Sequence, residues 1–161
     1  MNTNYQVIKS AEELRKAVES LTTHQVIGLD TETTELDPYY GRLRLLQLAT
    51  PGGVKVIDLD AFPSGDPKKD NALAPLRDLL SAPRPIKILH NAKFDAKFIK
   101  HTFGTDLGGI FDTLLASQLL GAGDIEAILN GPQLADITLA GLTKPFPIDL
   151  QRQRISKSLT I

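Results

Sequence analysis

One stretch constrains the fold more than any other, the segment 26–34, in which an apolar run ends in two carboxylates. The unbroken apolar character of Val26–Leu29 is typical of a strand that is buried on both faces. Asp30 and Glu32 follow one residue apart, and side chains at i and i+2 of a strand point to the same face. Like charges held so close in a half-buried site repel each other unless a cation or a shared proton neutralises them. The stretch therefore predicts a strand whose end presents two carboxylates to a divalent metal ion.

The chain has 161 residues, of which 42% are hydrophobic and 23% charged, so we expect one globular domain with a full core. No apolar run approaches the ~20 residues of a membrane helix, and the N-terminal residues open no signal peptide. We therefore expect a cytoplasmic protein with no membrane partner. The sequence does not predict an oligomeric state.

The absence of cysteine excludes disulfides and thiolate metal sites, and leaves carboxylates and three histidines as strong ligands. Oxygen ligands favour magnesium or manganese. The formal net charge of −1 gives no overall attraction to nucleic acid. A nucleic-acid partner would therefore depend on a local basic patch and on metal.

The first half of the chain predicts a helix followed by three strands. Ser10 and Glu13 form a capping-box pattern at the start of a helix that extends to Leu21. After the strand at Val26, the segments Arg42–Ala49 and Val54–Leu59 read as two more strands with short connections. Three consecutive strands of this kind form an antiparallel meander.

The second half alternates helix and strand and then loses its pattern. We expect a helix over 72–80, a strand over 86–89, a helix over 91–101 with Asn91 as its N-cap, and a helix over 113–120. Short helices over 125–129 and 134–142 are possible, and the part from about 145 is incomplete or irregular. The whole, 1–161, is predicted to be a single α/β domain with a mixed sheet flanked by helices.

Asp95 is a second carboxylate in an unusual place. It lies in the first turns of the predicted helix, and its i+3 and i+4 neighbours, Phe98 and Ile99, belong to the apolar face. A carboxylate on that face is disfavoured unless it is paired or bound to metal. Because the strands 26–29 and 86–89 both run into such groups, we expect Asp30, Glu32 and Asp95 to meet at one edge of the sheet.

These residues also resemble a known family. Asp-Thr-Glu-Thr at 30–33 is similar to the first motif of the four-carboxylate 3′–5′ exonucleases, the group of ribonuclease D and the proofreading domain of DNA polymerase I. The segments 90–95, His-Asn-Ala-Lys-Phe-Asp, and 111–120, which begins Phe-Asp-Thr, resemble its second motif and following helix. The resemblance implies an RNase H-like fold.

The resemblance further implies a metal-dependent exonuclease that acts on the 3′ end of single-stranded DNA or RNA. Two Mg²⁺ or Mn²⁺ ions, about 4 Å apart, would activate water and stabilise the leaving oxygen. The catalytic and metal-binding residues implied are Asp30, Glu32 and Asp95, with Asp112 as a possible further ligand. The nucleic-acid contacts implied are Thr33, Leu36, Asn91 and Lys93, and Lys97 with the Arg42/Arg44 pair could meet phosphates.

The third motif of that family, a Tyr or His a few residues before a fourth aspartate, has no match after Leu120. Asp124, Asp136 and Asp149 all lack the accompanying residue, and the segment 150–152 resembles what precedes the motif. We therefore expect the chain to stop just short of it. The alternative function is a catalytically weak or inactive truncated module that binds nucleic acid or a partner protein.

Structural interpretations exist for each candidate. Asp30 and Glu32 taken alone fit a turn at the end of a strand, and Asp95 fits a carboxylate stabilised by a helix dipole. Asp112 fits a helix N-cap better than a ligand, and His90 fits a packed or hydrogen-bonded histidine better than a base. The lysines of helix 91–101 fit a solvated face.

Overall fold

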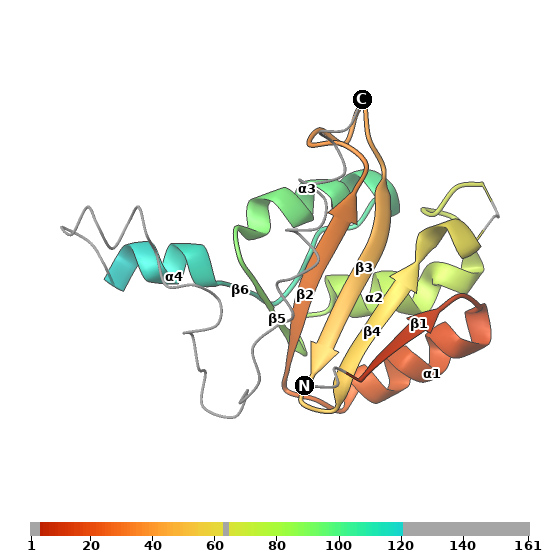
Figure 1. Ribbon diagram of the computed structural model, residues 1–161, viewed down its shortest axis with the longest axis horizontal. Coiled ribbons are helices and arrows are strands. Elements are labelled where there is room, and N and C mark those ends of the chain that lie inside the picture. The colour runs from red at the N-terminus through yellow and green to blue at the C-terminus, as the bar shows by residue number, and fades with distance from the viewer. Residues whose placement is uncertain (1–3, 63–64, 121–161) are drawn as a thin grey trace, which may run out of the picture.

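The computed structural model describes residues 4–62 and 65–120, which form a six-stranded mixed sheet and its covering helices (Figure 1). The strands are β1 Tyr5–Ile8, β2 Val26–Thr33, β3 Leu43–Thr50, β4 Gly53–Asp58, β5 Ile86–Leu89 and β6 Ile110–Asp112. The α-helices are α1 Ala11–Thr22, α2 Ala74–Ser81, α3 Ala92–Phe103 and α4 Thr113–Leu120, with 3₁₀ turns at Leu59–Ala61 and Asn71–Leu73.

The sheet combines a meander with parallel strands, as the sequence predicts. Its strand order is β1-β4-β3-β2-β5-β6. Strands β2, β3 and β4 pair antiparallel, whereas β5 is parallel to both β2 and β6, and β1 is parallel to β4. The strand that carries Asp30 therefore lies inside the sheet, between β3 and β5. This mixed α/β architecture confirms the predicted fold class.

Helix α1 begins as its sequence predicts. The Ser10 hydroxyl accepts a hydrogen bond from the Glu13 backbone N–H, and the Glu13 carboxylate accepts one from the Ser10 backbone N–H. This reciprocal pair satisfies two amide groups that the first turn leaves without helical partners. The apolar face of α1 then enters the core through Leu14, Val18 and Leu21.

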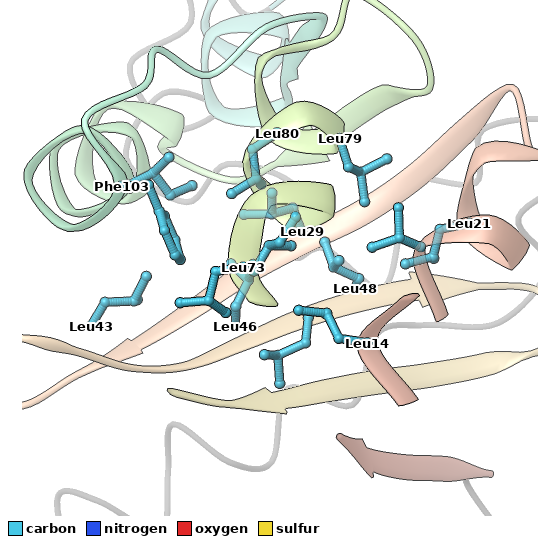
Figure 2. Close-up of a cluster of buried hydrophobic side chains, with 14 of the residues drawn as sticks. Leu14, Leu21, Leu29, Leu43, Leu46, Leu48, Leu73, Leu79, Leu80 and Phe103 are labelled. Carbon is cyan, nitrogen blue, oxygen red and sulfur yellow. The ribbon is translucent and has the colours of Figure 1, made fainter. Parts of the chain in front are cut away.

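The core lies between the helices and one face of the sheet. In Figure 2, leucines of α1 and α2 surround Leu29 of β2 and Leu46 and Leu48 of β3. Figure 1 shows the same layering, with α1, α2 and α3 behind the strands. Because side chains alternate along β2, Asp30 and Glu32 belong to the face opposite Leu29.

The last strand, β6, is fixed against the end of α2. A side chain at Gly108 would bring its Cβ within 2.1 Å of the Ser81 carbonyl oxygen, so only glycine fits there. The Gly109 carbonyl accepts a hydrogen bond of 2.7 Å from the Lys87 backbone N–H, which ties β6 to β5. The Lys87 side chain is fully buried, its ammonium donates to the Ala82 carbonyl at 2.6 Å, and burial lowers its pKa to about 8.

Some predicted boundaries differ from the observed ones. Strands β1 and β6 were not predicted, because both are short and much of their apolar surface is exposed, so neither shows the pattern of a buried strand. Strand β2 continues through both carboxylates to Thr33, and α3 continues to Phe103, where Gly104 ends it in a left-handed conformation.

The predicted short helices over 125–129 and 134–142, the irregular part from about 145 and the candidates Asp124, Asp136 and Asp149 lie outside the described residues. Within the part of the chain that the structure describes, no helix combines the length and apolarity needed to cross a lipid bilayer.

Candidate active site

Asp30 lies on β2 and is half-buried. Burial and, second, the negative charge of Glu32 on the same strand together raise the pKa of Asp30 to about 6, against a hydrogen bond from the Thr31 backbone that lowers it. Glu32 is itself buried, with 8% of its surface exposed. The charge of Glu32 thus disfavours ionisation of Asp30, which is the repulsion that the sequence predicts for this pair.

Asp95 is buried at the interface of α3 with the sheet, with only 4% of its surface exposed. The Thr31 hydroxyl donates a hydrogen bond of 2.6 Å to Asp95 Oδ1. Burial, together with the charge of Asp30, raises the pKa of Asp95 to about 6, although the Thr31 hydrogen bond opposes this rise. Asp95 thus lies on the core side of α3, as the sequence predicts, and its charge interacts with that of Asp30.

Thr31 is a functional candidate that the sequence reasoning missed. It occupies the position between Asp30 and Glu32, and alternation along the strand directs its side chain to the opposite face, toward α3. Its contact with Asp95 joins residues 64 positions apart, so no local pattern reveals it. The signal available was a threonine at the one position of the motif that faces the helix layer.

These carboxylates suit a hard cation by their chemistry. They supply only oxygen donors. A nearby positive charge would stabilise the ionised forms of Asp30 and Asp95, and so offset the burial and charge repulsion that raise their pKa values. The residues that the structure describes contain no group of three histidine, aspartate or glutamate side chains already gathered around a metal position. The donor set thus fits a divalent ion in kind.

Asp112, the possible further ligand, acts as a double helix cap. Its carboxylate accepts hydrogen bonds of 3.0 and 2.9 Å from the backbone N–H groups of Asn91 and Ala92, at the start of α3. It also accepts one of 2.9 Å from the Leu114 backbone N–H in α4. The capping interpretation is therefore confirmed, and we leave Asp112 out of the proposed ligand set.

Asn91 is the N-cap residue of α3, as the sequence predicts, but its side chain does not provide the capping hydrogen bond. The side chain makes no capping hydrogen bond, and the backbone is left-handed with φ 60°. Asp112 supplies the cap from a different strand, so Asn91 has its backbone N–H occupied and its side chain exposed. The Asn91 side chain thus does not cap α3, which suits its predicted role along a nucleic-acid strand.

His90 lies at the junction of β5 and α3 and is hydrogen-bonded, as its sequence context suggests. The Thr113 hydroxyl donates to the Leu89 carbonyl at 3.0 Å and lies 3.0 Å from His90 Nδ1. Since the single hydroxyl proton is used, Nδ1–H of His90 donates to Thr113 and Nε2 faces away from this contact.

The other residues predicted to contact nucleic acid lie around this end of the sheet. Thr33 is buried, and its hydroxyl donates to the Glu35 carbonyl at 2.7 Å, so its side chain shapes the loop that follows β2. Leu36 in that loop is 85% exposed, and Lys93 on α3 is exposed. These placements are compatible with the predicted contacts, which stay predictions.

The Arg42/Arg44 pair is less available to phosphates than the sequence suggests. The Arg42 guanidinium contacts the Asp60 carboxylate through two nitrogens, and Arg44 contacts both Asp58 and Asp60. The two arginines are therefore matched by two aspartates. Positive charge that could contact phosphates must therefore come from other residues.

Comparison with known proteins identifies the family. The model of the 3′–5′ exonuclease family matches residues 5–146, which is most of the chain. The chain belongs to this family. The two carboxylate motifs on β2 and α3 both fall within the matched region.

Individual relatives of this exonuclease domain agree. Ribonuclease D of Gluconacetobacter diazotrophicus is 35% identical over 118 residues, which cover 73% of this chain and 28% of that protein. DNA polymerase I of Aquifex aeolicus is 34% identical over 118 residues, covering 73% of this chain and 18% of the polymerase. The chain thus spans less than a third of the curated relatives that it matches.

Solved structures share the fold. The structure of Trypanosoma brucei RNase D in complex with RNA U12 superimposes with a TM-score of 0.63 at 22% identity, covering 73% of this chain and 40% of that one. The RNase H-like architecture implied by the motifs is therefore confirmed. Divalent metal ions are the usual cofactors of this exonuclease family.

Proposed function

We propose that the chain hydrolyses phosphodiester bonds at the 3′ end of single-stranded nucleic acid, with a divalent cation, Mg²⁺ or Mn²⁺, held by Asp30, Glu32 and Asp95. Family membership supports the reaction class, and the RNA in the related RNase D complex supports the substrate class. The observation that carries the site is the interaction between the half-buried Asp30 of β2 and the buried Asp95 of α3, both with a pKa raised to about 6.

The cation, when bound, would polarise the scissile phosphate and lower the pKa of an attacking water. The protein's own residues prepare the site for it. Thr31 holds Asp95 in one orientation through its hydroxyl, and Asp112 fixes the first turn of α3, so that Asp95 and β2 keep their relative placement. The Thr33 backbone and the exposed Leu36 are proposed to contact the terminal nucleotide, the exposed Asn91 to line the path of the strand, and Lys93 to meet a phosphate.

The test is digestion of 5′-labelled single strands of DNA and RNA with added Mg²⁺ or Mn²⁺, with a 3′-blocked strand as substrate control. We expect stepwise shortening from the 3′ end by the wild type and its loss in Asp30→Ala. Asp78→Ala, which removes an exposed carboxylate on α2, is the matched control and should behave as the wild type. Cleavage that survives Asp30→Ala would contradict the proposed site.

A second candidate is a module that binds single strands with little or no hydrolysis. The observation that favours it is the engagement of Asp112 as a cap, which removes this residue as the fourth carboxylate. Strand binding by the wild type without cleavage under either metal would support the second candidate and contradict the first.

A further inference from the structure

An aromatic pair joins the loop after β2 to the last turns of α3. The ring of Tyr39 packs edge-on against the ring of His101, with centroids 5.3 Å apart and an interplanar angle of 71°. Tyr39 nevertheless has 82% of its surface exposed, and the adjacent Tyr40 has 86%. Exposed tyrosines held in place by a neighbour are unusual on a solvated surface, because burial normally rewards such rings.

The loop that carries Tyr39 is held by hydrogen bonds within it and between its ends. The Asp37 carboxylate accepts a 2.9 Å hydrogen bond from the Tyr39 backbone N–H, and the Asp37 carbonyl accepts one of 2.8 Å from Gly41. The ends of the loop are joined by hydrogen bonds between Thr34 and Arg42 in both directions. Gly41 lies so close to Glu35 that an added Cβ would come within 2.5 Å of the Glu35 Cβ. Tyr39 is thus presented by a fixed turn.

His101 continues a basic stripe along the outer side of α3. Lys93, Lys97 and His101 are spaced at i, i+4 and i+8, so they lie on one face, and all three are exposed. The stripe is ~12 Å long at ~1.5 Å per residue, which is comparable to a few nucleotide steps of a stacked strand at ~3.4 Å each.

Among the residues that the structure describes, the lysines of this stripe differ from their neighbours in having no acidic partner. Lys100 pairs with Asp106 at 2.8 Å, and Arg42 and Arg44 pair with Asp58 and Asp60. In the ranges 4–62 and 65–120, no ion pair involves Lys93 or Lys97. On a chain of net charge −1, this is a local positive surface whose charge is not cancelled.

We propose that Tyr39, His101, Lys97 and Lys93 form a binding track for the single strand upstream of its 3′ end. The lysines contact phosphates, and the Tyr39–His101 pair stacks against a base. Phosphate-binding cations combined with an exposed aromatic face are what sequence-tolerant binding of single strands requires. The inference rests on the proposed exonuclease function, since both parts of the track extend directly from β2 and α3, the elements that carry Asp30, Glu32 and Asp95.

Binding affinity for strands of two lengths tests the track. The full chain is titrated, with metal chelated to prevent cleavage, into a fluorescent dinucleotide and into an oligothymidylate or oligouridylate long enough to cover the stripe. We expect Tyr39→Ala to weaken binding of the longer strand by about 5-fold to 150-fold, the range for one stacked base, with a much smaller effect on the dinucleotide. Tyr39→Phe should restore binding of the longer strand.

Matched variants separate this from a general effect of surface change. Tyr5→Ala removes a tyrosine that is 65% exposed on β1, at the far edge of the sheet, and should leave both affinities unchanged. Lys97→Ala should reduce the slope of log affinity against log salt by about 0.7, the value for one phosphate contact on a single strand, and Lys16→Ala on α1 should not.

Equal affinity of Tyr39→Ala and wild type for the longer strand, or an equal loss for the dinucleotide, overturns the track. So does a Lys97→Ala slope identical to that of the wild type. The exonuclease proposal fails by a different result, namely the absence of Asp30-dependent cleavage of the dinucleotide by the wild type when metal is present. A difference between the oligothymidylate and oligouridylate affinities would show whether the track prefers DNA or RNA.

Discussion

Two aspartates at α3 have contrasting surroundings: Asp112 caps the helix from β6, whereas Asp95 belongs to the helix and is buried. Asp112 lies near the first turn of the helix, and its carboxylate accepts hydrogen bonds from three backbone N–H groups. These bonds hold the starts of α3 and α4. Asp95 lies on the buried side of the helix, where a single side-chain donor, Thr31, reaches it and the charge of Asp30 opposes its ionisation. The same functional group is structural where amides surround it and is available for chemistry where burial and repulsion dominate.

The comparison is tested most strongly by removing each carboxylate and measuring cleavage. Asp95→Ala should lower the metal-dependent rate by about 10³-fold or more, because a metal ligand supports several kcal/mol of transition-state stabilisation at ~1.36 kcal/mol per tenfold. Single-turnover rates with Mn²⁺ provide the measurement. Asp112→Ala, compared at a temperature where it is folded, should lose much less. Comparable losses in the two variants would show that the division between them is wrong.

The hydroxyl of Thr31 is the next feature to test, because it donates to Asp95, whereas the donors to Asp112 are backbone N–H groups. Thr31→Val keeps the shape of the side chain but removes the hydroxyl, so Asp95 loses its donor and its pKa rises further. We expect a loss of about 10-fold to 100-fold in activity or metal affinity, as is typical for groups that orient a ligand. Thr31→Ser should retain most of the activity. A valine variant with wild-type kinetics at pH 7 would remove Thr31 from the site.

Asp112 should affect stability more than any carboxylate of the proposed site. Asp112→Ala leaves the starts of α3 and α4 without their acceptor, and we expect the free energy of unfolding to fall by about 1–2 kcal/mol, the upper range for a lost helix cap. Urea unfolding followed by circular dichroism measures this. Asp112→Asn keeps one acceptor oxygen and should lie between the alanine variant and the wild type, so an asparagine variant less stable than alanine would argue against the cap.

In the metal-free protein, removing the charge of Asp30 should raise the free energy of unfolding, whereas removing the Asp112 carboxylate should lower it. Its folded pKa of about 6 exceeds the ordinary value of 3.8, so the folded state binds this proton more tightly and stability falls as pH rises from about 4 through 6. Asp30→Asn removes the charge, and we expect it to be about 1 kcal/mol more stable than wild type at pH 8 and nearly equal at pH 4. Thermal unfolding with EDTA checks this. A variant that is less stable at pH 8 would contradict the burial of an uncompensated charge.

Local patterns predicted much of this molecule. The capping box of α1, the apolar run of β2, the helix that buries Asp95 and the capping role of Asp112 at α4 are each decided by residues within a few positions of one another. Short connections predicted the antiparallel meander of β2, β3 and β4, and the resemblance of the motifs implied the RNase H-like fold.

The features that escaped prediction depend on contacts between distant segments. The Thr31–Asp95 hydrogen bond, the capping of α3 by Asp112 in place of Asn91, and the matching of Arg42 and Arg44 by aspartates all join residues 14 or more positions apart. Strands β1 and β6 escaped for a related reason, since their identity as strands comes from the neighbours β4 and β5. A hydrophobic pattern carries no information about such partners.

The cap that Asp112 provides also sets an order for assembly during synthesis. A nascent chain that has emerged as far as Phe103 contains every residue of α3, yet the acceptor for its first amide groups is still 9 residues from the ribosomal exit. Helix α3 therefore gains its N-terminal cap only after Asp112 has emerged, on the strand β6 that pairs with β5. The growing polypeptide therefore contains all three carboxylates of the proposed site before it contains the side chain that caps the helix carrying Asp95.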